Sequence, residues 1–280
     1  MTLPVTLTIA FEQWSTGYIE PSRTEIHTLE PEYLERNVRD HIQESWQSYA
    51  GTAAMPRITR EIERQGIQAT GIFSGIAVER YPRECEAFAA TGSEIAGHSY
   101  AQDIRAFKLT RPEERENILK TSALIEGIAG KAPVGWLNPG AQSSDNTREI
   151  LVSLGFKYQA DGVGGDGPEV VTLPAGRICL IPYQNDVNDL PLYAQMGMGP
   201  DVYLDMFQRK LAILLEESNE GFARYVNFTV HAAIFGRPWG VSVMRECIEI
   251  VKATDGAEFR TREQIADEAL SAAESNSSSA

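Results

Sequence analysis

The sequence alternates between short apolar segments and longer segments with apolar residues at helical spacing, and this alternation constrains the fold most. Seven short segments rich in β-branched and aromatic residues predict strands: Val5–Phe11, Ile67–Phe73, Glu94–His98, Val134–Leu137, Phe156–Ala160, Ile178–Tyr183 and Tyr225–Ala232. Most of the intervals hold predicted helices: Met55–Gln65, Arg83–Ala90, Pro112–Ile128, Thr147–Leu154, Val202–Glu217 and Val241–Lys252. Such alternation predicts parallel strands joined by crossover helices. An α/β barrel of about seven parallel strands suits this repeat better than an open sheet.

Two helix start signals can be recognised, and the chain length is compatible with one domain. Thr110 with Glu113, and Thr261 with Gln264, have the spacing of capping boxes that begin helices. A chain of 280 residues can bury one large core, and we predict a single domain over residues 1–270. The segment 271–280, SAAESNSSSA, is predicted to be a disordered tail.

Residues 12–50 interrupt the alternation after the first predicted strand. This insertion carries the aromatic residues Trp14, Tyr18, Trp46 and Tyr49. A long segment at the C-terminal end of a strand is typical of an active-site wall or an oligomer contact. An ordinary packed excursion is the alternative.

Charge and cysteine usage exclude several classes of protein. The formal net charge is −14 and the pI is about 4.8, so we expect neither nucleic acid nor a membrane as a partner. Cys85, Cys179 and Cys247 are far apart, which fits neither a disulfide framework nor a zinc ribbon. The first residues lack the basic and apolar regions of a secretory signal, and we therefore expect a cytoplasmic protein.

Functional side chains follow the C-terminal ends of the predicted strands, where β/α barrels place their catalytic groups. They are Glu12, Gln13, His98, Gln102, Asp103, Trp136, Asn138, Asp186, Asp189 and His231. Two of the four histidines, His98 and His231, lie at strand ends, although each could also be a satisfied half-buried histidine. Glu12 ends an apolar strand, where desolvation would raise its pKa and suit it to general base catalysis. A surface glutamate is the alternative for Glu12.

These residues fall in five segments that, in this order, resemble the polysaccharide deacetylase superfamily. The segments are TIAFEQW (Thr8–Trp14), GIQATGIFSG (Gly66–Gly75), SEIAGHSYAQD (Ser93–Asp103), GWLNPGAQSSDNTREILVSLGF (Gly135–Phe156), and LIPYQNDVND (Leu180–Asp189) combined with HAAIFGRPWGVSVMRECIEIV (His231–Val251). The last pair is most similar to the allantoinase-like branch.

The resemblance implies a distorted (β/α) barrel that hydrolyses a non-peptide C–N bond and assembles as a homo-tetramer. Superfamily members remove N-acetyl groups from amino sugars, or open cyclic amides such as allantoin and cyclic imides. Typical metal-dependent members bind zinc or a similar ion through one aspartate and two histidines.

The sequence departs from this metal-binding pattern at two of its three positions. Gln13 stands in place of the aspartate, His98 corresponds to the first histidine, and Gln102 stands in place of the second. Neutral amide oxygens bind a divalent transition ion far more weakly than carboxylate or imidazole. The three residues are therefore weak candidates for a metal such as zinc, and we expect no cofactor.

We predict a hydrolase that opens a small cyclic amide, imide or ureide, with this small molecule as its partner. Glu12 would be the general base, His231 the general acid, and His98 a group that binds substrate or water. Asp103 and Asp189 would orient these groups, and Trp136 and Asn138 would line the pocket. Two alternatives stay open: a metal-dependent N-deacetylase of a soluble sugar derivative, and a non-catalytic binding protein on the same scaffold.

Overall fold

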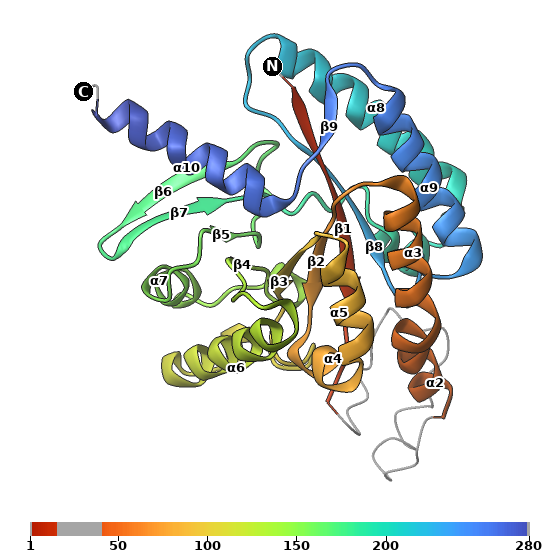
Figure 1. Ribbon diagram of the computed structural model, residues 1–280. Coiled ribbons are helices and arrows are strands. Elements are labelled where there is room, and N and C mark those ends of the chain that lie inside the picture. The colour runs from red at the N-terminus through yellow and green to blue at the C-terminus, as the bar shows by residue number, and fades with distance from the viewer. Residues whose placement is uncertain (1, 16–40, 279–280) are drawn as a thin grey trace.

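The computed structural model describes residues 2–15 and 41–278, which form a curled, mostly parallel sheet with helices packed around it (Figure 1). The strands are β1 (Leu3–Phe11), β2 (Thr70–Phe73), β3 (Glu94–Gly97), β4 (Gly135–Trp136), β5 (Tyr158–Gln159), β6 (Glu169–Leu173), β7 (Gly176–Leu180), β8 (Val226–His231) and β9 (Ala257–Phe259). Their order is β6-β7-β5-β4-β3-β2-β1-β8, with β9 paired to β1. After β7, Asn188 makes a parallel bridge to Thr229 of β8, which brings the two ends of the sheet together. The predicted distorted (β/α) barrel is confirmed.

All six predicted helices are present in the structure. The helices are α2 (His41–Tyr49), α3 (Met55–Gln65), α4 (Gly75–Arg80), α5 (Pro82–Ala90), α6 (Arg111–Ala129), α7 (Thr147–Ser153), α8 (Pro200–Asn219), α9 (Pro238–Ala253) and α10 (Arg262–Ser278). Short turns of helix lie at η1 (Ala50–Ala54), η2 (Ala106–Lys108), η3 (Pro139–Ala141) and η4 (Leu190–Gln195). In the described part of the chain, no helix is long and apolar enough to cross a membrane.

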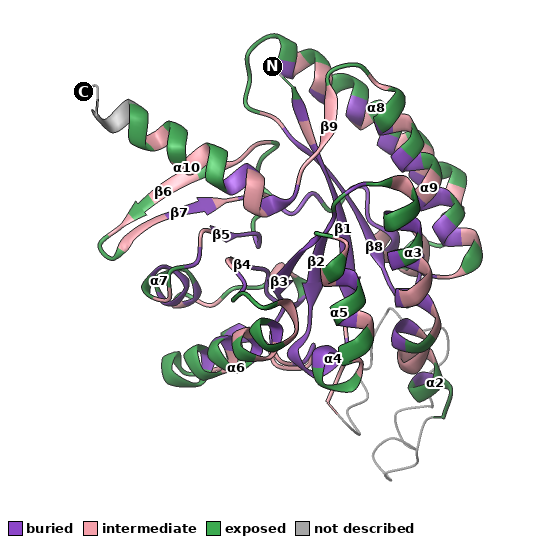
Figure 2. Cartoon of the chain, viewed as in Figure 1, coloured by how far each residue is buried: buried purple, intermediate pink, exposed green. Residues whose placement is uncertain are grey.

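The two faces of the sheet have different side chains because successive residues of a strand point to opposite faces. On β1, the odd-numbered residues Leu3 to Phe11 pack with the outer helices α3, α8 and α9 in the main hydrophobic core. Buried positions dominate strands β1, β2, β3 and β8 and the inner faces of these helices (Figure 2). The inner face of the sheet forms a second cluster with Ile265 and Ala266 of α10. This inner face carries the residues that reach the strand ends.

The start of α10 enters the interior of the curled sheet and satisfies buried polar groups there. The Glu94 carboxylate accepts hydrogen bonds from the Tyr158 hydroxyl (2.7 Å), the Thr70 hydroxyl (2.9 Å) and the Glu263 backbone N–H (2.9 Å). The fully buried Arg262 donates through Nη2 to the Asn227 side-chain oxygen (3.0 Å). The start of α10, although distant in sequence, therefore supplies hydrogen-bond donors to polar groups inside the curled sheet.

The strands β6 and β9 and the helix α10 differ from the sequence prediction, and α2 and α4 are helices beyond the six predicted. The edge strand β6 lies in a stretch predicted as loop, because its polar and half-exposed residues lack an apolar pattern. Strand β9 has only three residues and was not predicted. Helix α10 continues to Ser278, so most of the segment predicted as a tail is helical, since its Ala and Glu residues extend the preceding helix. Residues 16–40, the larger part of the insertion, lie outside the described residues.

Replacing Thr261 by Ala is expected to destabilise the protein by about 1 kcal/mol. The Thr261 N–H donates to Gln264 Oε1 (2.9 Å) and the Gln264 N–H donates to Thr261 Oγ1 (3.3 Å), which confirms the predicted capping box. Equilibrium urea unfolding measures the change. Ser122→Ala, inside α6, is the control and should change stability by less than about 0.5 kcal/mol. Equal effects of both substitutions would show that the cap does not stabilise α10.

Candidate active site

Glu12, His98 and His231 come together in one pocket at the C-terminal ends of the parallel strands. Glu12 follows β1, His98 follows β3, and His231 is the last residue of β8. All three line a pocket of about 240 Å³. Its apolar walls include Ile72, Leu137, Ala141, Val163, Leu190 and Pro191. The three residues predicted to be catalytic therefore lie together, as expected for groups at the C-terminal ends of barrel strands.

His98 holds Glu12 from one side. Its Nδ1 lies 2.6 Å from the Leu137 carbonyl oxygen and its Nε2 lies 3.0 Å from Glu12 Oε1. A carbonyl oxygen can only accept, so Nδ1 carries a hydrogen. The contact with Glu12 needs one further proton between the two atoms. His98 is therefore fixed by the Leu137 carbonyl and in turn holds one oxygen of Glu12.

His231 approaches Glu12 from the other side and is oriented by Asp189. His231 Nδ1 lies 2.7 Å from Asp189 Oδ1, and its Nε2 lies 3.7 Å from Glu12 Oε2. Asp189 is fully buried and also accepts the backbone N–H groups of His231 (2.8 Å) and Phe235 (3.0 Å). These bonds fix the carboxylate, so the imidazole presents Nε2 to the pocket.

The charges in the site separate the proton affinities of the acid and the base. Burial raises the pKa of Glu12, but the charge of His231 and the hydrogen bond from His98 lower it more, so the pKa lies below its ordinary value. This direction corrects the prediction that desolvation would dominate. Burial lowers the pKa of His231, but the Asp189 and Glu12 carboxylates outweigh it and hold this pKa above its ordinary value. The arrangement therefore favours the ionised form of Glu12 and the protonated form of His231.

Trp136 and Asn138 do not line the pocket, which corrects their predicted role. Trp136 is fully buried in the core outside the sheet, edge-on to Phe156 at a centroid distance of 6.0 Å. Asn138 donates its side-chain amide to Asp161 (2.8 Å) and accepts from the Trp136 indole (3.0 Å). Strand alternation explains the error, because Leu137 between them is the residue that faces the interior.

Two predicted acidic residues also lie away from the pocket. Asp103 accepts the backbone N–H of Ser15 (2.8 Å), so it fixes the chain that leaves β1 and does not itself line the pocket. Asp186 is half exposed and forms an ion pair with Lys210 of α8. Asp189 is the acidic residue that contacts a predicted catalytic group.

The residues present do not fit the divalent ion that the resemblance implies. Gln13 Oε1 accepts from the Arg80 guanidinium (3.1 Å). The positive charge of this guanidinium would repel a metal ion bound to the same oxygen. Gln102 uses its side-chain N–H groups on Ser74 Oγ (2.9 Å) and on the His98 carbonyl (3.3 Å). Both ring nitrogens of His98 already contact protein oxygens. In the described ranges no three His, Cys, Asp or Glu side chains are grouped to hold a metal ion.

A wall of uncharged polar residues escaped the sequence analysis. Tyr183, Asn185, Asn188 and Gln195 line the pocket from the segment between β7 and α8. Asn188 donates to Asn185 Oδ1 (2.8 Å) and accepts from the Leu190 N–H (2.9 Å), which fixes its amide. Within the segment PYQNDVND, only the two aspartates were predicted as site residues, whereas its tyrosine and its two asparagines line the pocket.

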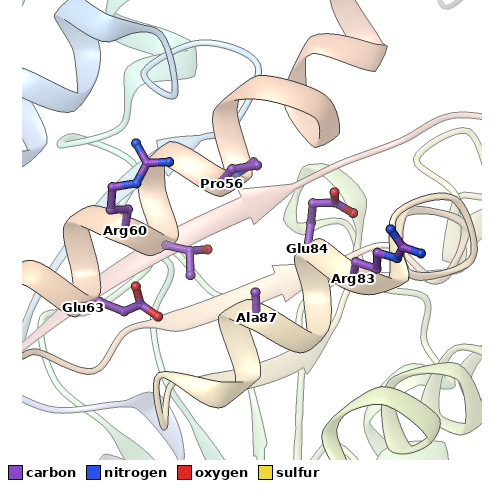
Figure 3. A pocket seen from close by; sticks show the side chains of 7 residues that line it. Pro56, Arg60, Glu63, Arg83, Glu84 and Ala87 are labelled. Carbon is purple, nitrogen blue, oxygen red and sulfur yellow. The ribbon is translucent and has the colours of Figure 1, made fainter.

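A second hollow lies between α3 and α5 and has a volume of about 260 Å³ (Figure 3). It is lined by Pro56, Thr59, Arg60, Glu63, Arg83, Glu84 and Ala87. Arginines and glutamates alternate around it, and no lining residue is a histidine or a cysteine. It lacks the paired base and acid of the strand-end pocket, which we therefore assign as the candidate active site.

Comparisons with known proteins agree with this architecture. Residues 45–159 match the family model for polysaccharide deacetylase. A peptidoglycan deacetylase of Helicobacter pylori is 23% identical over 251 residues, which are 79% of this chain and 85% of that protein. Among solved structures, a probable polysaccharide deacetylase from Pseudomonas aeruginosa has a TM-score of 0.82 at 22% identity, covering 95% of this chain and 90% of its own. The allantoinase PuuE has the same TM-score and identity, covering 95% and 89%.

The match to the deacetylase family and the deacetylase and allantoinase relatives support a hydrolase acting on carbon–nitrogen bonds other than peptide bonds, and the strand-end pair of carboxylate and imidazole is compatible with this class. The chain is similar to the polysaccharide deacetylase superfamily, whose family model matches residues 45–159, and it shares its fold with a polysaccharide deacetylase and an allantoinase. The resemblance predicted from the sequence motifs is thereby confirmed.

Proposed function

We propose that the protein hydrolyses a ring C–N bond in a small cyclic amide, imide or ureide. The observation that carries the proposal is Glu12 held between His98 and His231, beside a set of side chains that does not fit a metal ion. Base and acid are thus supplied by side chains alone.

In the first step Glu12 acts as the base. Water lies between its carboxylate and the substrate carbonyl, gives one proton to Glu12, and its oxygen forms a bond to the carbonyl carbon. The carbonyl π electrons move to the oxygen and form a tetrahedral oxyanion. His98 keeps the carboxylate in place through the 3.0 Å contact.

In the second step His231 acts as the acid. As the C–N bond breaks, His231 gives its Nε2 proton to the leaving nitrogen, while Asp189 stabilises the imidazolium before transfer. The proton on Glu12 returns to His231 Nε2 across the 3.7 Å gap, and the new acid leaves as a carboxylate after losing its proton to solvent. The site regains its starting charges.

The pocket supports a small ring as substrate. Apolar walls and the neutral amides of Asn185, Asn188 and Gln195 suit a flat, uncharged ring with N–H and C=O groups. Without a metal, hydrolysis depends on a more reactive carbonyl, and a five-membered imide is attacked more easily than an unactivated acetamide. The structural likeness to an allantoinase supports the same class.

Purified protein treated with a chelator is expected to open at least one of succinimide, hydantoin, dihydrouracil and allantoin, and to keep its activity within about twofold of the untreated enzyme. Ring opening is followed by ultraviolet absorbance, and bound metal by elemental analysis. Mock-treated protein and a boiled sample are the controls. Absence of turnover on the whole panel would contradict the proposal and favour a binding protein.

A second candidate is a metal-dependent N-deacetylase, which the peptidoglycan deacetylase relative favours. Stoichiometric zinc, activity that is lost on chelation, and release of acetate from an N-acetylated sugar would establish this candidate. The same experiment thus separates the two functions.

A further inference from the structure

Tyr183 lies in the pocket wall, and its hydroxyl oxygen receives hydrogen bonds from two sides. The Asn188 side-chain N–H donates to it at 3.0 Å. The side chain of Thr229 also hydrogen-bonds to it. Tyr183 is 8% exposed and lines the pocket together with Glu12 and His231.

A buried chain of hydrogen bonds holds Thr229 beside Tyr183. Arg262 can only donate, and its Nη2 donates to Asn227 Oδ1 (3.0 Å). Asn227 then donates through Nδ2 to Thr229 Oγ1 (3.1 Å). The Thr229 hydroxyl keeps its own hydrogen, which it can donate to Tyr183, and donation in this direction lowers the pKa of the phenol. The Arg262 guanidinium also lies 5.9 Å from the centre of the Tyr183 ring, which helps to hold the ring.

The tyrosine hydroxyl is consequently a donor toward the pocket. Its oxygen accepts from Asn188 and, with Thr229 donating as well, the hydroxyl hydrogen is left for the pocket that Tyr183 lines. Burial above all raises the pKa of Tyr183, which favours the protonated hydroxyl. Two accepted hydrogen bonds polarise an O–H group and strengthen it as a donor.

We propose that Tyr183 is a catalytic residue that stabilises the oxyanion of the tetrahedral intermediate, a role that rests on the proposed hydrolysis. The O–H donates a hydrogen bond to the oxyanion while water adds to the carbonyl, and no proton is transferred from Tyr183. When the C–N bond breaks, the oxyanion electrons re-form the carbonyl and the hydrogen bond weakens. The phenol supplies the electrostatic stabilisation that neighbouring carboxylates cannot give.

Tyr183→Phe removes this donor and keeps the ring. We expect kcat on the best substrate of the ring panel to fall by about 100- to 1,000-fold with KM changed less than about threefold. Tyr203→Phe is the matched control, since that fully buried hydroxyl bonds the Thr229 carbonyl (2.9 Å) and is not in the pocket. Activity of Tyr183→Phe within threefold of the wild type would overturn the proposal.

Thr229→Val tests the positioning chain with an isosteric side chain. We expect a smaller loss of kcat, about tenfold, and no additional loss when it is combined with Tyr183→Phe, because both changes remove the same donor function. Additive losses would assign Thr229 a merely structural role and remove it from the proposal.

Hydrolysis of 4-nitrophenyl acetate separates this proposal from the proposed function. This activated ester forms an oxyanion but contains no ring C–N bond. If the ester reacts but no ring substrate is opened, the ring-opening function fails. In that case, a loss of ester hydrolysis in Tyr183→Phe but not in Tyr203→Phe still supports the oxyanion role. If neither reaction depends on Tyr183, the oxyanion role is overturned.

Discussion

Replacing Glu12 by Gln is expected to lower kcat/KM for the ring substrate by about a thousandfold, within the range of general acid–base catalysis. The amide keeps the size of the side chain and can still contact His98, but it cannot take a proton from water. Initial rates at neutral pH on chelator-treated protein measure the loss. Because Glu12 is only 18% exposed and sits between two imidazoles, circular dichroism and thermal unfolding should accompany the rates.

Glu149→Gln is the matched control for this substitution. Glu149 is half exposed and pairs with Arg111 at 2.7 Å on the outer surface, so its loss should leave the rate within about twofold. A folded Glu12→Gln enzyme that keeps more than about a tenth of the activity would show that another group activates the water.

Replacing His231 by Gln is expected to lower kcat/KM by about a hundredfold or more for a ring amide with a basic leaving nitrogen. The loss should be much smaller for 4-nitrophenyl acetate, because its leaving group needs no proton. His41→Gln, at an exposed position of α2, is the control and should be silent on both substrates. Equal losses on the two substrates would assign His231 a role in binding or in stabilising the oxyanion.

The pH profile gives an independent measure of the same two groups. The active form has Glu12 ionised and His231 protonated. Since the pKa of Glu12 is lowered and that of His231 is raised, activity should fall in acid only below the ordinary carboxyl range, and in base only above about 6.5. The alkaline decline should disappear in His231→Gln while the acid decline remains. Wild-type activity that rises with pH above about 6.5 would show that protonated His231 is not required in the active form.

The sequence was sufficient to predict the barrel and the three groups at its centre. The parallel strands could be recognised from their apolar segments, and the C-terminal ends of parallel strands meet at one edge, so Glu12, His98 and His231 were expected to converge. Asp189 was identified as a group that could orient a histidine, and the structure shows which one. Periodicity, the position of the residues at strand ends and the resemblance to the deacetylase superfamily together carry these conclusions.

The remainder depended on side-chain direction and loop path, which a single sequence does not specify. Trp136 and Asn138 flank Leu137, and a one-residue change of facing reverses the pocket assignment at that strand end. Tyr183 and Asn188 became visible only with the path of the segment after β7. The lowered pKa of Glu12 required the positions of two imidazoles that lie 86 and 219 residues away along the chain.

The insertion of α10 into the curled sheet has a consequence for the order in which the molecule assembles during synthesis. β1 is synthesised before its neighbour β8. The hydrogen bond from the Glu263 N–H to Glu94 can form only after almost the whole chain has been made. Until then, the Glu94 carboxylate lacks one of its three hydrogen-bond donors, and the inner hydrophobic cluster lacks Ile265 and Ala266. The catalytic pocket is therefore completed late, by a segment that contributes none of its lining residues.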